Sequence, residues 1–90
     1  MSMNPWRERV ALVTGASAGI GEAVALALGA AGMRVAVTAR RAERLNELVR
    51  KIRAAGGDAI AIPADARVPH DIESVYEQIK QSWGGIDVLV

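Results

Sequence analysis

The chain has 90 residues, of which 51% are hydrophobic and 23% are charged, and its formal net charge is +1. This length allows one domain at most, and the balance of residues is typical of a soluble globular fold. A charge this close to zero gives no electrostatic basis for nucleic-acid binding, and the lack of cysteine excludes disulfides and thiolate metal sites. No apolar stretch is long enough to span a membrane and the N-terminus lacks a secretory pattern, so we expect no membrane partner and a cytoplasmic location.

The first apolar run of the chain covers residues 10–13 and has no polar alternation, which is typical of a strand buried on both faces. A helical pattern begins at Ile20, because Ile20, Val24 and Leu28 recur at intervals of four residues. Gly32 ends this pattern. We therefore expect a strand and then a helix.

A second strand and helix follow in the same order. Residues 35–38 predict the strand, and the next segment has one apolar face that predicts a helix ended by the glycines at 56–57. Residues 59–62 predict a third strand, stopped by Pro63. The apolar face of the second helix comprises Leu45, Leu48, Val49 and Ile52.

A third helix is predicted to begin at Pro69, which suits the first turn of a helix. Its N-cap is weak, because Val68 stands where Ser, Thr or Asp is preferred. The glycines at 84–85 end it, and residues 86–90 begin a fourth strand. Its inner face comprises Ile72, Val75, Tyr76 and Ile79.

These segments follow the order βαβαβαβ with short connections. Right-handed crossovers and strands buried on both faces predict an α/β fold, a Rossmann-type doubly wound parallel sheet that is truncated after the fourth strand. The expected strand order is 3-2-1-4, with the switch point between strands one and four. Residues 1–90 then form the N-terminal part of a single domain, and ligands bind at the carboxyl ends of its strands.

A glycine-rich turn at residues 14–21 joins the first strand to the first helix. Gly15 permits a tight turn, Gly19 leaves room for a pyrophosphate beside the backbone, and Gly21 allows the helix to pack closely on the sheet. Unpaired N–H groups and a partial positive charge at the helix start favour phosphate. Three glycines can also form an ordinary loop, but the position between a buried strand and a helix favours a nucleotide site.

Two more residues of this turn are candidate contacts to a cofactor. Ser17 can donate a hydrogen bond to a phosphate, or it can merely stabilise the turn. Ile20 lies at the helix start, where backbone N–H groups are unpaired.

The spacing Thr-Gly-x-x-x-Gly-x-Gly at residues 14–21 resembles the turn of the short-chain dehydrogenase/reductase family. The resemblance covers residues 7–90. It includes Asp65 after the third strand, and residues 87–90 are similar to the strand that precedes the family's Asn-Asn-Ala-Gly. The resemblance implies an oxidoreductase with a nicotinamide cofactor.

The end of the second strand indicates which nicotinamide cofactor binds. Ala39 occupies the position where an acidic residue would accept hydrogen bonds from the ribose hydroxyls and repel a 2′-phosphate. Arg40 and Arg41 follow, and a guanidinium can hold a phosphate with two hydrogen bonds, so NADP is favoured over NAD. Arg41 is explained equally well as a solvated residue at the start of a helix.

In the resembled family, an aspartate at the position of Asp65 hydrogen-bonds the adenine amino group. The alternative is that Asp65 serves only as a helix cap or a loop carboxylate.

No catalytic residue is assigned within the chain. The resembled family uses a Tyr-x-x-x-Lys with a Ser and an Asn, all beyond the fourth strand, whereas Tyr76 and Lys80 copy this spacing too early in the fold. We therefore interpret Tyr76 as a core-packing residue, like Trp6 and Trp83. His70 is the only histidine and has no partner for nucleophilic or metal chemistry, so no metal site is expected.

The expected function is NADP(H)-dependent reduction of a carbonyl or oxidation of an alcohol on a small-molecule substrate, with this chain supplying the cofactor-binding half. The catalytic residues are expected beyond Val90, and the full-length form is expected to be a homo-oligomer. Alone, the chain should be inactive and should associate through the edge of its fourth strand. Two alternatives stay open, a non-catalytic nucleotide-binding module and a Rossmann enzyme of other chemistry, such as a sugar-nucleotide epimerase.

Overall fold

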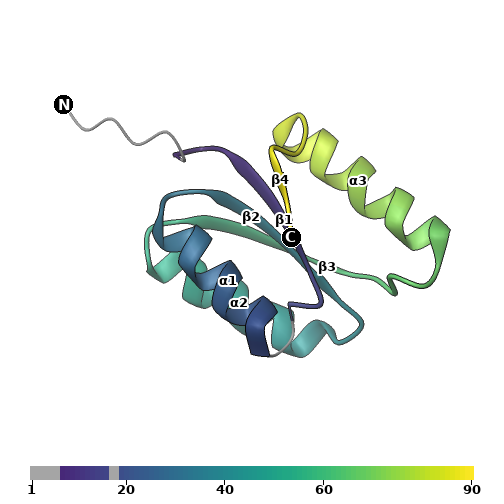
Figure 1. Cartoon of the computed structure of the whole chain (residues 1–90), viewed down its shortest axis with the longest axis horizontal. Helices are drawn as coiled ribbons and strands as arrows, with labels where there is room; N and C mark the ends of the chain where they lie inside the picture. The colour runs from purple at the N-terminus through teal and green to yellow at the C-terminus, as the bar shows by residue number, and fades with distance from the viewer. Residues whose placement is uncertain (1–6, 17–18) are drawn as a thin grey trace.

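The computed structural model describes residues 7–16 and 19–90. Its helices and strands are β1 (Val10–Thr14), α1 (Gly19–Ala30), β2 (Arg34–Ala39), α2 (Ala42–Ala54), β3 (Asp58–Pro63), α3 (Pro69–Trp83) and β4 (Val88–Leu89). The strands form one parallel sheet in the order β3-β2-β1-β4, which confirms the predicted order. Figure 1 shows α1 and α2 on one face of this sheet and α3 on the other, as predicted for a doubly wound fold.

The two neighbours of β1 differ in the extent of their pairing. β2 pairs with β1 along its whole length, whereas β4 pairs with it only at Val88 and Leu89. Asp87 fixes the start of β4, because its N–H donates to the Val10 carbonyl (2.8 Å) while its Oδ2 accepts from the Val10 N–H (2.8 Å). At its other end, the Val90 N–H donates to the Leu12 carbonyl (2.9 Å) and the Val90 carbonyl accepts from the Thr14 N–H (3.1 Å), so the short β4 is held to β1 at both ends.

Side chains of the strands alternate between two buried clusters, one on each face of the sheet. In β1, Ala11 and Val13 belong to the cluster beneath α1 and α2, whereas Val10 and Leu12 belong to the cluster beneath α3. This alternation buries both faces of β1, as the unbroken apolar run predicts. The predicted apolar face of α2 is also confirmed, and its buried residues are Leu45, Leu48, Val49 and Ile52.

The buried face of α1 is not centred on the side chains that recur at intervals of four residues. The fully buried residues are Ala25 and Gly29, whereas Ile20 is 84% exposed and Val24 and Leu28 are only partly buried. Nearly every residue of α1 is apolar, so the helix has no single hydrophobic stripe that sets its rotation about its axis. Close packing of small residues against α2 sets that rotation instead.

Two glycines allow this close approach of α1 to the end of α2. A Cβ added to Gly29 would lie 2.5 Å from Cγ2 of Ile52, and a Cβ added to Gly57 would lie 2.5 Å from the carbonyl oxygen of Gly29. The Gly57 N–H also donates to the Ile52 carbonyl (3.1 Å). The contact between the two helices therefore depends on the missing side chains.

The two ends of α3 agree with the sequence. Val68 is the N-cap and makes no side-chain capping hydrogen bond. At the other end, Gly84 has a left-handed φ of 87°, and its N–H donates to the Lys80 carbonyl (2.9 Å). A glycine is favoured there because a Cβ strains this conformation.

The inner face of α3 is narrower than predicted. Val75 and Ile79 are buried, but Tyr76 is 44% exposed, so its interpretation as a core-packing residue is wrong. Successive residues of a helix point about 100° apart, which carries Tyr76 beyond the edge of the buried stripe. Trp83 is half-buried against the cluster beneath α3, as predicted, and Trp6 lies outside the described residues.

Candidate functional site

A cavity of about 620 Å³ lies at the carboxyl ends of β1, β2 and β3. This is the edge of the sheet where the topology predicts a ligand. The cavity is lined by residues of three loops that are far apart in the sequence, together with one side chain of α3. The lining residues are Thr14, Gly15, Thr38, Ala39, Arg40, Arg41, Ala64, Asp65, Ala66, Arg67 and Ile72.

The glycine turn after β1 presents open backbone. Gly15 and Gly19 both have a left-handed φ of 62°, and a Cβ added to either would have no atom within 4 Å. The turn is tied to β2, because the Ala16 N–H donates to the Thr38 carbonyl (3.1 Å). The space over these glycines and the N-terminus of α1 together suit an anionic group. The predicted contact Ser17 lies outside the described residues.

Gly21 has a different role from the other two glycines of the turn. A Cβ added to it would lie 2.5 Å from the Gly15 carbonyl oxygen and 3.2 Å from the Ala16 Cα. The close contact that Gly21 permits is therefore between α1 and the turn itself, whereas the sequence predicted contact with the sheet. Ile20, between these glycines, points its side chain into solvent.

Two arginines lie where β2 ends. Arg40 and Arg41 are both exposed and both line the cavity, beside the half-buried, uncharged Ala39. Arg41 is also the N-cap of α2 and makes no side-chain capping hydrogen bond. Both predicted candidates for a phosphate contact are thus at the same cavity as Gly15.

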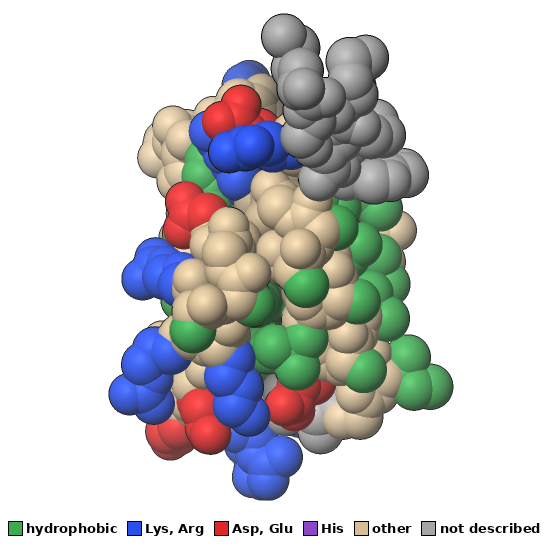
Figure 2. Space-filling view, turned by 90° about the vertical axis from the view of Figure 1, so that its left-hand side faces the viewer, with side chains coloured by type: hydrophobic (Ala, Val, Ile, Leu, Met, Phe, Trp, Pro, Cys, Tyr) green, Lys and Arg blue, Asp and Glu red, His purple; other side chains and the backbone are tan. Residues whose placement is uncertain are grey.

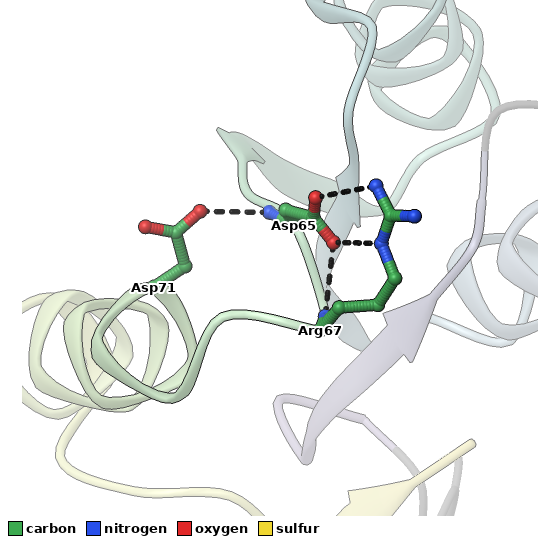
Figure 3. A network of polar contacts seen from close by, with 3 residues as sticks. All are labelled: Asp65, Arg67 and Asp71. Carbon is green, nitrogen blue, oxygen red and sulfur yellow. Dashed lines mark hydrogen bonds and ion pairs between the residues drawn. The ribbon is translucent and has the colours of Figure 1, made fainter.

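Asp65 is the centre of a polar network that follows β3 (Figure 3). Its Oδ1 accepts hydrogen bonds from the Arg67 backbone N–H (2.9 Å) and Nε (3.1 Å), and its Oδ2 accepts one from Arg67 Nη2 (2.9 Å). The Asp65 N–H donates to Asp71 Oδ2 in the first turn of α3 (2.9 Å). Three hydrogen bonds from one arginine hold the carboxylate in place.

The same contacts explain the acidity of Asp65. The side-chain hydrogen bonds from Arg67 and then its backbone N–H lower the pKa of Asp65 from 3.8 to about 2, and the positive charges of Arg67 and Arg40 add to this effect. The hydrogen bond to the carboxylate raises the pKa of Arg67 in turn. Both groups are therefore charged throughout the neutral range.

Arg67 is a cavity residue that the sequence analysis missed. It lies outside the motifs that carry the family resemblance above, and an isolated arginine in a loop is most often solvated. The one available signal is its spacing from Asp65, because an aspartate commonly accepts a hydrogen bond from the backbone N–H two residues later. That spacing brings the guanidinium back onto the carboxylate.

Residues that resemble catalytic groups lie outside the cavity. Tyr76 and Lys80 are exposed on α3 and do not line the cavity, and His70 is exposed at the start of the same helix.

Within residues 7–16 and 19–90, no three His, Cys, Asp or Glu side chains are grouped so that they could hold a metal ion. No helix in the described part of the chain is long and apolar enough to cross a membrane.

The cavity therefore combines the open backbone of Gly15, three arginines and one aspartate, and the turn that begins at Gly15 leads to the N-terminus of α1. Such a site can bind an extended ligand that carries more than one phosphate and a hydrogen-bonding base.

Comparison with known proteins agrees with this geometry. The short chain dehydrogenase family matches residues 9–90. Human dehydrogenase/reductase SDR family member 11 is 40% identical over 98% of the chain, and farnesol dehydrogenase of Aedes aegypti is 39% identical over 98% of it. The match spans 35% and 36% of the lengths of these two relatives.

Solved structures of the same family have the same fold. L-sorbose reductase of Gluconobacter frateurii, complexed with NADPH and L-sorbose, superposes with a TM-score of 0.90 at 31% identity, over 97% of this chain and 34% of its own. A metagenomic short-chain oxidoreductase in complex with NADP superposes with a TM-score of 0.89 at 42% identity, over 93% of this chain and 38% of its own. The chain thus spans about a third of the length of its relatives, and it belongs to the short chain dehydrogenase family of oxidoreductases.

Proposed function

We propose that the chain is the cofactor-binding part of an NADP(H)-dependent oxidoreductase that reduces a carbonyl or oxidises an alcohol on a small molecule. In this proposal residues 1–90 form the N-terminal part of one domain. When bound, the nicotinamide supplies or accepts the hydride. The residues of this chain bind the adenosine and pyrophosphate portions and thereby orient the cofactor.

The glycine turn fits a pyrophosphate. The Cβ positions of Gly15 and Gly19 are open, so a phosphate can approach the backbone there without a clash. The N-terminus of α1 supplies N–H donors and a partial positive charge to the same space. Ser17 and the backbone of Ile20 complete this part of the proposed site.

The single observation that carries the choice of NADP is the pair Arg40 and Arg41 at the cavity, directly after the uncharged Ala39. A carboxylate at the position of Ala39 would repel a 2′-phosphate, whereas a guanidinium binds one with charge-assisted hydrogen bonds. Two solved relatives whose complexes contain NADPH and NADP support the same choice.

Asp65 fits an adenine amino group in this proposal. A carboxylate offers about four acceptor positions, and the hydrogen bonds from Arg67 occupy two on Oδ1 and one on Oδ2. One position on Oδ2 is left for a donor from the base. Asp65 thus serves as a loop carboxylate and is also placed to contact a ligand.

The proton donor of the reaction is proposed to lie outside the described residues. Tyr76 and Lys80 have the spacing of the family's catalytic pair, but neither lines the cavity and both are exposed on α3. The resemblance places the catalytic residues after the strand that corresponds to β4.

Calorimetric titration with NADPH and NADH tests the proposal. We expect tighter binding of NADPH, and we expect Arg40→Ala to weaken NADPH binding by about 1–3 kcal/mol, the scale of a charge-assisted hydrogen bond, while NADH binding changes little. Arg50→Ala is the matched control, because Arg50 is exposed on α2 and does not line the cavity. Equal affinities, or tighter NADH binding, would refute NADP as the cofactor.

A further inference from the structure

Asp65 is the one carboxylate among the residues that line the cavity, and it shares that lining with Arg40 and Arg41. Two unit charges separated by less than the Debye length, about 8 Å at physiological salt, interact appreciably. A bare carboxylate here would oppose a phosphate on the adenosine ribose. It would also compete with that phosphate for the nearby guanidinium groups.

Arg67 prevents this competition by its geometry. Its side chain forms a two-pronged ion pair with Asp65, with Nε 3.1 Å from Oδ1 and Nη2 2.9 Å from Oδ2, and its backbone N–H adds a third bond. The two residues are separated by one position in the same loop, so little chain entropy opposes the pair. The side chain of Arg67 is 75% exposed, and no other ion pair joins it to a described residue.

We propose that Arg67 is a specificity-determining residue, which neutralises the Asp65 carboxylate and so leaves Arg40 and Arg41 available to a 2′-phosphate. This inference rests on the proposed function and adds to it a residue that acts through Asp65. Arg67 is a positioning residue for the charge of the cavity, with no direct contact to the phosphate.

Arg40 is the guanidinium group that would pair with Asp65 if Arg67 did not neutralise the carboxylate. Arg40 already exerts an electrostatic effect on Asp65 in the presence of Arg67. Without Arg67, the Asp65 carboxylate would interact more strongly with Arg40, whose charge already acts on it. A bound 2′-phosphate would then lose hydrogen bonds from Arg40, and the Asp65 carboxylate would repel it.

The test compares adenosine 2′,5′-bisphosphate with adenosine 5′-monophosphate, which differ only in the 2′-phosphate. Dissociation constants are measured by NMR titration of the full chain for the wild type, Arg67→Ala, Asp65→Asn and the double variant, with Arg50→Ala as the matched control for charge. The readout is the ratio of the two affinities, because a loss of adenine contacts or a looser loop affects both nucleotides alike. Circular dichroism checks that each variant is folded.

We expect Arg67→Ala to lower the preference for the bisphosphate several-fold, because an uncompensated carboxylate then repels the 2′-phosphate across the cavity. The double variant should recover the wild-type ratio, because it has neither the carboxylate nor its partner. Arg50→Ala should leave the ratio unchanged.

Each other outcome has a definite meaning. A preference that survives Arg67→Ala would overturn the inference and leave the proposed function intact. A preference that falls but does not recover in the double variant would also overturn it, and would instead indicate a direct contact between Arg67 and the phosphate. A wild-type chain that binds both nucleotides equally would refute the proposed choice of NADP and the inference with it.

Discussion

Gly19 and Gly84 have similar backbones but different surroundings with respect to the cavity. Each has a left-handed φ, and a Cβ added to either meets no atom within 4 Å. Gly19 begins α1 and belongs to the turn that starts at the cavity residue Gly15, whereas Gly84 ends α3. Comparison of the two therefore separates backbone strain from loss of ligand space.

We expect Gly19→Ala to abolish detectable nucleotide binding, because its Cβ would enter the space proposed for the pyrophosphate. Gly84→Ala should cost a similar amount of stability, about 1 kcal/mol for an alanine in this conformation, and should leave binding unchanged. Titration with NADPH and urea denaturation of both variants would check this. Retained binding in the Gly19 variant would mean that the turn holds no phosphate.

The acidity of Asp65 provides a prediction that needs no ligand. Its pKa is lowered to about 2 in the folded chain, so the Asp65–Arg67 pair contributes stability above pH 3.8, the unfolded value, and that contribution is lost as the pH falls towards 2. Arg67→Ala should raise the pKa of Asp65 towards 3.8, and carbon-detected NMR titration of the carboxyl would measure it. Lys80→Ala, on the exposed side of α3, should leave this pKa unchanged.

The residues of the site were predictable to different degrees. Gly15, Arg40, Arg41 and Asp65 were placed at one cavity by sequence, because each follows the carboxyl end of a strand and parallel strands bring these ends together. Their contacts with a cofactor stay predictions. Arg67 was missed because its role arises from a loop conformation that spacing alone does not establish.

At the level of whole elements, the periodic pattern predicted the sheet, the helices and the buried face of α2, but it did not indicate which face of α1 is buried. α2 is amphipathic, so its apolar positions could face only the sheet. α1 has one charged residue, Glu22, and offers apolar side chains in every direction. The rotation of α1 about its axis depends on the contacts of Gly29 with Ile52 and Gly57. These contacts involve residues outside α1, so the sequence of α1 alone does not predict them.

The close contact between Gly57 and Gly29 predicts that Gly57→Ala and Gly85→Ala differ in their effect on the free energy of unfolding. Gly57→Ala should destabilise the chain by about 1–3 kcal/mol, because its Cβ would overlap the backbone of Gly29, which cannot move without shifting α1. Gly85→Ala should change the free energy of unfolding by less than about 0.5 kcal/mol, since its Cβ meets open space and it has no left-handed φ. Urea denaturation would measure both, and equal effects would contradict the proposed dependence on close packing.

At the level of the whole molecule, several large hydrophobic side chains of the described residues are exposed, and two of them are more than half exposed. Ile20 is 84% exposed on α1, and Leu89 is 59% exposed on β4, an edge strand of the described sheet. In the view of Figure 2, hydrophobic side chains gather along one side, whereas Lys and Arg side chains mixed with Asp and Glu gather along the other. An apolar edge strand recruits other chains by pairing with them.

We therefore expect the 90-residue chain to self-associate, with an average mass in sedimentation velocity that rises with concentration. Leu89→Lys should shift the distribution towards the monomer, because a charge on an edge strand disfavours pairing with a second chain. Glu73→Lys, on the exposed surface of α3, changes charge without touching that edge and should have no such effect. A wild-type chain that stays monomeric at all concentrations would contradict the expectation.

The cavity is built from three loops that backbone hydrogen bonds join into one unit, since the Ala16 N–H donates to the Thr38 carbonyl (3.1 Å) and the Ala64 N–H donates to the Ala39 carbonyl (3.0 Å). A ligand that occupies this cavity binds only when β1, β2 and β3 are all in register. Binding and folding are therefore linked equilibria, and a ligand at 100 times its dissociation constant adds about 2.7 kcal/mol to the free energy of unfolding. For a chain of marginal size, the proposed binding of a nucleotide at this cavity would therefore raise the fraction of molecules that are folded.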